Sequence, residues 1–282
     1  MVQGAQAVVL VDRPAPHVAR VLINRPDKRN AIDLEVRELM MVALHALAAD
    51  AQVRAIVFGG VGGVFSAGGD LASMAGLDAD GARERMQHIH TLCAQIAALP
   101  LPVVSAIEGV GAGAAIGLAL LGDYIVVGEG AKILFPFFKV GLTPDWGQLL
   151  TLPKRVGMGT ARRILTAGVP VLGPEALRIG LADELAPDAD AMNTAVRKAS
   201  ELAALPAGAF ARAKLRLNNP SASLAEELSR ELADQSCCLT SVEFAEGIGA
   251  FMEKRSPEFT KFPREVSVAP GLPLTTPEAA RS

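Results

Sequence analysis

Two glycine-rich loops in this 282-residue chain each follow a short apolar run. The first is Ala67-Gly68-Gly69-Asp70, and the second runs from Gly109 to Ala114. Apart from Asp70, their side chains are too small to carry chemistry, but such loops offer exposed backbone N–H groups. Two N–H groups directed at one point form an oxyanion hole. The alternative is that the glycines serve only tight turns and close packing.

The pattern around these loops predicts an α/β protein. Apolar runs at 8–11, 18–23, 55–58, 103–107 and 124–127 predict strands, and the first two are typical of a hairpin. Apolar residues recur with helical spacing from Val36 to Leu47, after the predicted N-cap Asp33. A second helix is expected at 82–98, and a third near Gly113.

From Trp146 onward the chain is predicted to be mainly helical. The segments 223–226 (SLAE) and 240–243 (TSVE) each have the pattern of a capping box that opens a helix. The helices expected there carry apolar stripes that need a partner, at Leu224, Leu228 and Leu232 and at Phe244, Ile248 and Phe251. The proline-containing segment 263–282 is expected to be a flexible tail.

Composition excludes several classes of partner. With 27 basic and 30 acidic residues the net charge is −3, so we expect neither a nucleic-acid partner nor an anionic membrane surface. The 14 uncharged residues between Glu108 and Asp123 are too few to span a bilayer. Cys93, Cys237 and Cys238 form neither a disulfide framework nor a zinc motif. We expect a cytoplasmic protein without a signal peptide.

The second loop also fits a dinucleotide fingerprint, GxGxxA, at Gly109, Gly111 and Ala114, with Glu129 twenty residues after Gly109. This hypothesis predicts NAD binding. It is weak in a chain with 27 glycines, because the segment before Gly109 does not open a series of regular βαβ units.

Four motifs in this order resemble the crotonase (enoyl-CoA hydratase/isomerase) superfamily. They are 24–31 (NRPDKRNA), 65–71 (FSAGGDL), 102–109 (PVVSAIEG) and 246–255 (EGIGAFMEKR), and the resemblance covers residues 8 to 262. It implies a spiral of repeated ββα units over 1–200, followed by a helical trimerisation region at 201–262. It also implies an acyl-CoA thioester substrate, a homotrimer or a dimer of trimers, and no metal or redox cofactor.

Carried over by motif, the oxyanion donors are the N–H groups of Gly69 and Ala114. We expect Asp70 to organise its loop through backbone hydrogen bonds. Lys28, Arg29 and Lys261 are expected to contact the phosphates of CoA, although solvated surface charge is an equal alternative. The other residues expected at the CoA ester are Ala67, Gly68 and Leu71.

The departures from the family pattern concern the catalytic carboxylates. Hydratases of the family carry two glutamates, and the corresponding positions here are Gly117 and Phe137. The segment 141–147 (GLTPDWG) resembles a loop of isomerase-type members, in which an acid after the proline is the base. This makes Asp145 the candidate proton shuttle, and a helix N-cap is its alternative role. Phe137, Phe138 and Trp146 line a hypothetical acyl pocket, unless they are plain core residues.

The resemblance therefore implies an enzyme that stabilises an enolate of an acyl-CoA, with double-bond isomerisation favoured over hydration. Two alternatives stay open. One is hydration, or another acyl-CoA reaction, through residues that the motifs do not identify. The other is a CoA-ester-binding protein that has lost catalysis.

Overall fold

A hairpin opens the computed structural model, which describes residues 7–264 of the chain. β1 (Val9–Ala15) pairs antiparallel with β2 (Val18–Ile23), as the two apolar runs predict. The other strands join in parallel, in the order β1-β2-β3-β4-β6-β9. These strands are β3 (Ala55–Gly60), β4 (Val103–Ile107), β6 (Tyr124–Gly128) and β9 (Glu184–Ala186).

A second, three-stranded sheet has the order β5-β7-β8. Its strands are β5 (Val110–Ala112), β7 (Lys132–Leu134) and β8 (Val171–Leu172). The chain passes from β4 directly into β5 and then into α3 (Ala114–Leu120), and β6 is followed in the same way by β7. This repetition of two strands, one in each sheet, gives the spiral core of the crotonase fold that the motifs imply.

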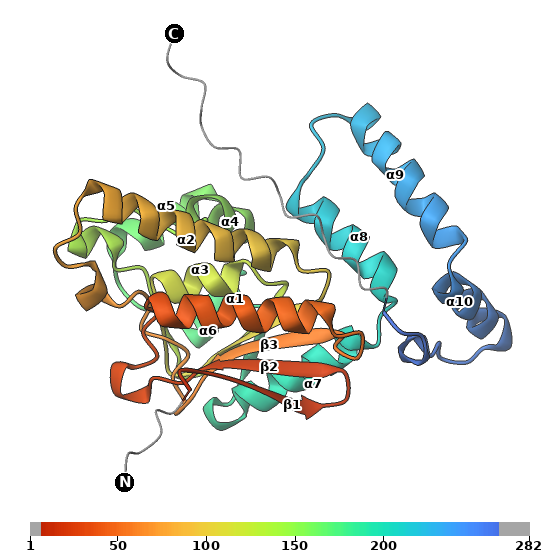
Figure 1. Ribbon diagram of the computed structural model, residues 1–282, viewed down its shortest axis with the longest axis horizontal. Helices are drawn as coiled ribbons and strands as arrows, with labels where there is room; N and C mark the ends of the chain where they lie inside the picture. Colours follow the sequence, from red (N-terminus) through yellow and green to blue (C-terminus); the bar gives the residue numbers. More distant parts are fainter. Residues whose placement is uncertain (1–6, 265–282) are drawn as a thin grey trace.

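The large sheet is covered on both faces (Figure 1). Along β3, Ala55 and Val57 belong to the smaller buried cluster with α7 (Ala191–Ala203), whereas Ile56 and Phe58 belong to the main core. This alternation follows from the two-residue period of a strand. Helix α7 approaches the sheet closely because its buried face is a stripe of alanines at 191, 195, 199 and 203.

Two helices cover the opposite face and begin at aspartates. In α1 (Leu34–Ala49), Asp33 accepts a hydrogen bond from the Val36 N–H, which confirms the predicted cap. In α2 (Ala79–Ala98), Asp78 accepts from Gly81, so this helix begins three residues before the predicted start. The remaining helices of the core are α4 (Gln148–Val156), α5 (Met158–Ala167) and α6 (Gly173–Arg178).

Three C-terminal helices extend away from the sheets (Figure 1). They are α8 (Ala207–Asn218), α9 (Leu224–Leu239) and α10 (Val242–Glu253). The buried ammonium of Lys214 fixes α8 to the core by donating to Asp123 at 2.7 Å and to the Leu101 carbonyl at 2.8 Å. In contrast, α9 has no buried residue, and both predicted apolar stripes are exposed. Within the described residues, no helix combines the length and apolarity needed to span a membrane.

One predicted capping box is displaced. Ser223 caps α9 through the Glu226 N–H, as predicted. The cap of α10, however, is Ser241 and not Thr240. Glu243 instead accepts hydrogen bonds from the N–H groups of residues 207 and 208, at 2.7 and 3.0 Å. The carboxylate satisfies donors at the start of α8, where the helix dipole also favours negative charge. The predicted tail lies outside the described residues from residue 265 onward.

Candidate active site

The two glycine-rich loops lie against each other. Ser66 donates its N–H to the Val110 carbonyl and accepts from the Ala112 N–H, both at 3.0 Å. Gly68 has a left-handed φ of 91°, and a Cβ at this position would lie 2.4 Å from the Ala112 carbonyl oxygen. Only glycine allows both this backbone conformation and this approach of the loops.

Two free N–H donors result from this contact. Ile32 pairs with the neighbours of Gly69, donating to the Gly68 carbonyl at 2.7 Å and accepting from Asp70 at 3.0 Å. Ala114 begins α3, so its N–H has no partner within that helix. Across residues 7–264, neither Gly69 nor Ala114 donates a backbone hydrogen bond. A Cβ at Gly68 would lie 3.4 Å from the Ala114 nitrogen, so the loop that carries Gly69 passes close to the Ala114 N–H.

The carboxylate of Asp70 holds the first loop together. Its Oδ2 accepts from the Arg25 guanidinium at 3.2 Å and lies 3.7 Å from Lys28 Nζ. Its Oδ1 accepts from the Ala72 N–H at 3.1 Å. Burial opposes ionisation, but the Arg25 hydrogen bond and the Lys28 charge outweigh it, so the pKa of Asp70 is lowered. Asp70 therefore stays ionised and fixes the loop.

The cations expected at CoA have different surroundings. Lys28 and Arg29 are exposed beside the first loop. Lys261 Nζ donates to Glu246 Oε2 at 2.6 Å, so a carboxylate of the same chain already binds this ammonium. Leu71 begins a short 3₁₀ helix after Asp70, and 57% of its surface is exposed.

Asp145 lies between the 3₁₀ helix at Phe137–Val140 and α4. Its Oδ1 is buried without a hydrogen-bond partner among residues 7–264. Burial raises the pKa of Asp145 to about 6, although a backbone hydrogen bond and the nearby Arg85 and His90 lower it. A carboxyl group with a pKa in this range suits proton transfer near neutral pH.

The cap hypothesis for Asp145 is wrong. The N-cap of α4 is Gly147, and no side chain accepts a hydrogen bond there. Trp146 and Gly147 both have left-handed backbones, with φ of 52° and 73°. A positive φ is rare for a bulky residue such as tryptophan. This conformation separates the Asp145 carboxyl from the first turn of α4.

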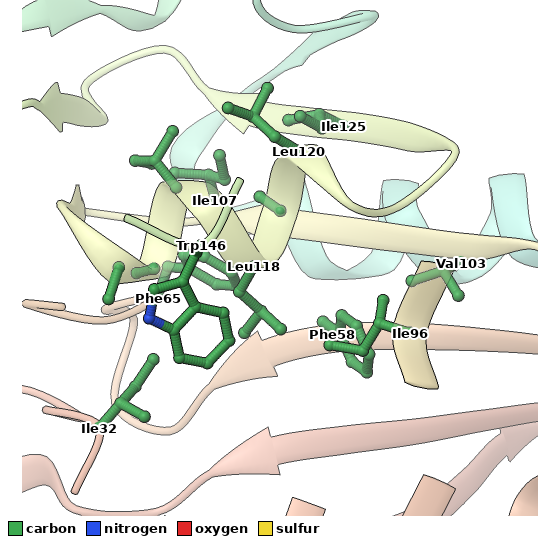
Figure 2. Packing of buried hydrophobic residues seen from close by; sticks show 14 of the residues in the cluster. Ile32, Phe58, Phe65, Ile96, Val103, Ile107, Leu118, Leu120, Ile125 and Trp146 are labelled. Atoms are coloured by element: carbon green, nitrogen blue, oxygen red, sulfur yellow. The ribbon is translucent and has the colours of Figure 1, made fainter. Parts of the chain in front are cut away.

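Trp146 fills the space beside Gly117, the first hydratase glutamate position. A Cβ at Gly117 would lie 2.3 Å from the Trp146 Cβ. The indole is buried in the main core with Phe65 and Leu118 (Figure 2). Because the contact involves the Cβ of Trp146 and not a flexible side-chain end, position 117 cannot accept a glutamate without moving this loop.

The other two aromatic residues of the expected acyl pocket, Phe137 and Phe138, differ in burial. Phe137, at the second glutamate position, is buried, and its Cζ would lie 3.8 Å from a Cβ at Gly113. It therefore packs on the turn before Ala114. Phe138 is 55% exposed. Phe137 and Trp146 are thus core residues beside the site, and Phe138 is a surface residue.

Comparisons with known proteins identify the family of this chain. The family model described as enoyl-CoA hydratase/isomerase matches residues 15–262. The chain belongs to the enoyl-CoA hydratase/isomerase family. This crotonase-superfamily enzyme is similar to a Rhodobacter capsulatus protein named probable enoyl-CoA hydratase, with 35% identity over 86% of this chain and 94% of the relative. The 1,2-epoxyphenylacetyl-CoA isomerase of Escherichia coli is 30% identical, over 86% of this chain and 95% of its own.

A solved structure supports the assignment. The enoyl-CoA hydratase of Bacillus anthracis has a TM-score of 0.85 to this enzyme at 27% identity, over 90% of this chain and all of that one. The family acts on acyl-CoA thioesters.

Sequence reasoning missed two polar residues of the enzyme. Gln148 is fully buried, and its Nε2 donates to the carbonyls of Gly113 and Asp145 at 3.2 and 3.0 Å. Arg85, on α2, donates to Ser73 Oγ at 3.1 Å, and its Nη2 would lie 3.7 Å from a Cβ at Gly69. Neither belongs to a motif, so only proximity in the fold could identify them.

Other titratable groups near the site do not form a metal centre. Burial raises the pKa of the Cys93 thiol to about 12, so this thiol is protonated at neutral pH. His88 accepts a hydrogen bond from Arg37, and His90 is exposed. In the part of the chain that the structure describes, no three His, Cys, Asp or Glu side chains are grouped as metal ligands.

Proposed function

We propose that this enzyme moves the double bond of an enoyl-CoA, with Asp145 as the proton shuttle. One observation carries the proposal. Asp145 Oδ1 is the one carboxylate oxygen within residues 7–264 that is buried without a hydrogen-bond partner. A buried acceptor without a partner is costly to stability, and such groups are typical of functional sites.

In this scheme the substrate is a 3-enoyl-CoA whose thioester oxygen accepts hydrogen bonds from Gly69 and Ala114. Asp145 removes a proton from C2, and the electron pair of that bond moves onto the thioester as a dienolate. The two N–H groups stabilise the oxyanion, each by about 10²–10³ in rate. The protonated Asp145 then returns the proton to C4, which yields the 2-enoyl-CoA. The reaction is redox-neutral and uses no metal in this scheme.

The lack of the paired glutamates favours isomerisation. Hydration needs a water that is both oriented and deprotonated, whereas one carboxylate suffices to move a proton between two carbons. Gly117 and Phe137 stand at the two glutamate positions, and Trp146 blocks the first of them.

Hydration is the second candidate, because relatives named enoyl-CoA hydratase include the Rhodobacter capsulatus protein and the solved Bacillus anthracis structure. Gln148 offers one feature for it. Its Oε1 is a buried acceptor without a partner among the described residues, and such an acceptor could orient a water beside Asp145.

A panel of 3-enoyl- and 2-enoyl-CoA esters tests the proposal. We expect chromatography of the reaction products to show conversion of 3-enoyl to 2-enoyl esters, with much slower hydration of the 2-enoyl esters. Hydration that exceeds isomerisation would favour the second candidate. Binding of the esters without any turnover would identify a CoA-ester-binding protein.

We also propose that the enzyme assembles as a homotrimer or a dimer of trimers. The exposed apolar stripes on α9 and α10 support this, since isolated helices with such faces are poorly stabilised in water. Residence in the cytoplasm stays a prediction.

A further inference from the structure

Arg85 places a positive charge beside the first oxyanion donor. Its Nη2 would lie 3.7 Å from a Cβ at Gly69, so the guanidinium lies next to the backbone that would hold the thioester oxygen. It is also close enough to Asp145 for the two charges to interact. Arg85 therefore lies beside the oxyanion loop and near the candidate base.

The guanidinium has few partners for its charge. Its one side-chain hydrogen bond is to the neutral hydroxyl of Ser73, at 3.1 Å. Within residues 7–264 it forms no ion pair. The nearest loop carboxylates, Asp33 and Asp70, are both paired with Arg25, at 2.8 and 3.2 Å. A guanidinium has five donors, so most of those of Arg85 are free for a ligand.

A second cation, Arg37, lies near Arg85. Arg37, on α1, is 2% exposed, and its one side-chain hydrogen bond goes to a ring nitrogen of His88 at 3.3 Å. Burial and the nearby charge of Arg85 lower the pKa of Arg37 to about 10, so both arginines are charged at neutral pH. Two adjacent guanidinium groups repel each other, and an anion between the helices and the loop would relieve this repulsion.

We propose that Arg85 binds a carboxylate carried by the acyl chain of the substrate. This inference rests on the proposed function, because it takes the thioester to be held at Gly69. Arginine recognises carboxylates through two parallel hydrogen bonds, and Arg37 adds to the local positive potential. The substrate class is then a dicarboxylic acyl-CoA.

Two saturated ligands of equal length test this without depending on turnover. Hexanoyl-CoA and hexanedioyl-CoA differ only in a terminal methyl or carboxylate group. We expect calorimetry to show that hexanedioyl-CoA binds the wild type about 10–100-fold more tightly. In Arg85→Gln the affinities for the two ligands should differ by less than about threefold. Arg85→Lys should retain part of the preference for hexanedioyl-CoA. Thermal melting checks that each variant is folded.

Arg83→Gln is the matched control, since Arg83 lies on the same helix but is exposed and paired with Asp80. It should keep the full preference. Equal affinity of the wild type for both ligands would overturn this inference alone, and so would an equal loss of both affinities in Arg85→Gln. Failure of the wild type to bind either ligand would overturn the proposed function as well.

Discussion

The side-chain amide of Gln148 lies 3.2 Å from the carbonyl oxygen of Gly113, to which it donates a hydrogen bond. The same nitrogen donates to the carbonyl of Asp145 at 3.0 Å. Gly113 directly precedes the donor Ala114, so one buried amide joins the backbone of the oxyanion turn to that of the candidate base.

We predict that Gln148→Leu lowers kcat by about 10–10²-fold with a smaller change in KM, because both catalytic backbones lose this connection. The free energy of unfolding should fall by about 1–2 kcal/mol. Steady-state kinetics and urea unfolding measure the two effects. Gln95→Leu is the control, since Gln95 also donates its amide to a carbonyl, that of Met41, but outside the site. A similar kcat loss in both variants would argue against a specific role for Gln148.

Gly69→Pro removes one predicted oxyanion donor, because proline has no N–H. Activity should fall by at least about 10²-fold. Gly69→Ala keeps the N–H. Its Cβ would crowd the flexible end of Met74, at 2.6 Å, and would lie at an ordinary contact distance of 3.7 Å from Arg85 Nη2. The alanine variant should therefore lose far less activity. A folded proline variant as active as the alanine variant would refute the assignment of this donor.

Asp145→Asn is nearly isosteric but cannot take up a proton. We expect isomerase activity to fall by about 10²–10⁴-fold while affinity for acyl-CoA is retained. In the wild type, kcat/KM should rise with pH around an apparent pKa of about 6, because the base must be ionised. Asp80→Asn, at an exposed aspartate of α2, should leave this profile unchanged. Unchanged isomerisation by the Asp145 variant would mean that the base is another residue.

The same substitution should alter the pH dependence of stability. Burial raises the pKa of Asp145 from 3.8 to about 6 on folding, so the folded chain binds this proton more tightly than the unfolded chain. The free energy of unfolding therefore falls as pH rises through that interval, by about 2–3 kcal/mol in total. An asparagine side chain cannot titrate, so Asp145→Asn should gain about this much stability relative to wild type as pH rises from about 4 to about 7.

Urea unfolding at equal protein concentration measures this difference. The exposed Asp80→Asn variant serves again as the control, and its stability should run parallel to that of the wild type. Parallel curves for Asp145→Asn as well would show that Asp145 has no raised pKa.

Assembly should depend on the exposed face of α9, where Leu228 and Leu232 lie one turn apart. The double substitution Leu228→Lys and Leu232→Lys should give monomers in size-exclusion chromatography with light scattering, because two charges would enter an apolar contact. Val42→Lys, at an exposed apolar residue of α1, is the control and should leave the assembly intact. An unchanged assembly in the double variant would place the contact elsewhere.

Local patterns in the sequence determined the elements of the core. The apolar run at 103–107 predicts a strand with the observed bounds, because it lies between prolines and a glycine turn. Asp33 is predictable as the cap of α1, because a capping side chain needs only the N–H groups of the next few residues as partners. The four motifs, in their order along the chain, predicted the crotonase fold and the enoyl-CoA hydratase/isomerase family, and both predictions are confirmed.

Tertiary structure decided what surrounds the reacting atoms. Gly117 and Trp146 are 29 positions apart, and no spacing rule places the tryptophan Cβ where a glutamate would stand. Glu243 has the pattern of a cap for α10 but satisfies the start of α8, because the fold brings unpaired N–H groups within its reach. Arg85 and Gln148 belong to no motif. A side chain's burial and partners depend on segments distant in the chain, whereas hydrophobic period and capping depend on neighbours. The sequence therefore determined most strands and helices of the core, but not the short strands β8 and β9, which lie in the stretch predicted to be mainly helical. Packing decided the site.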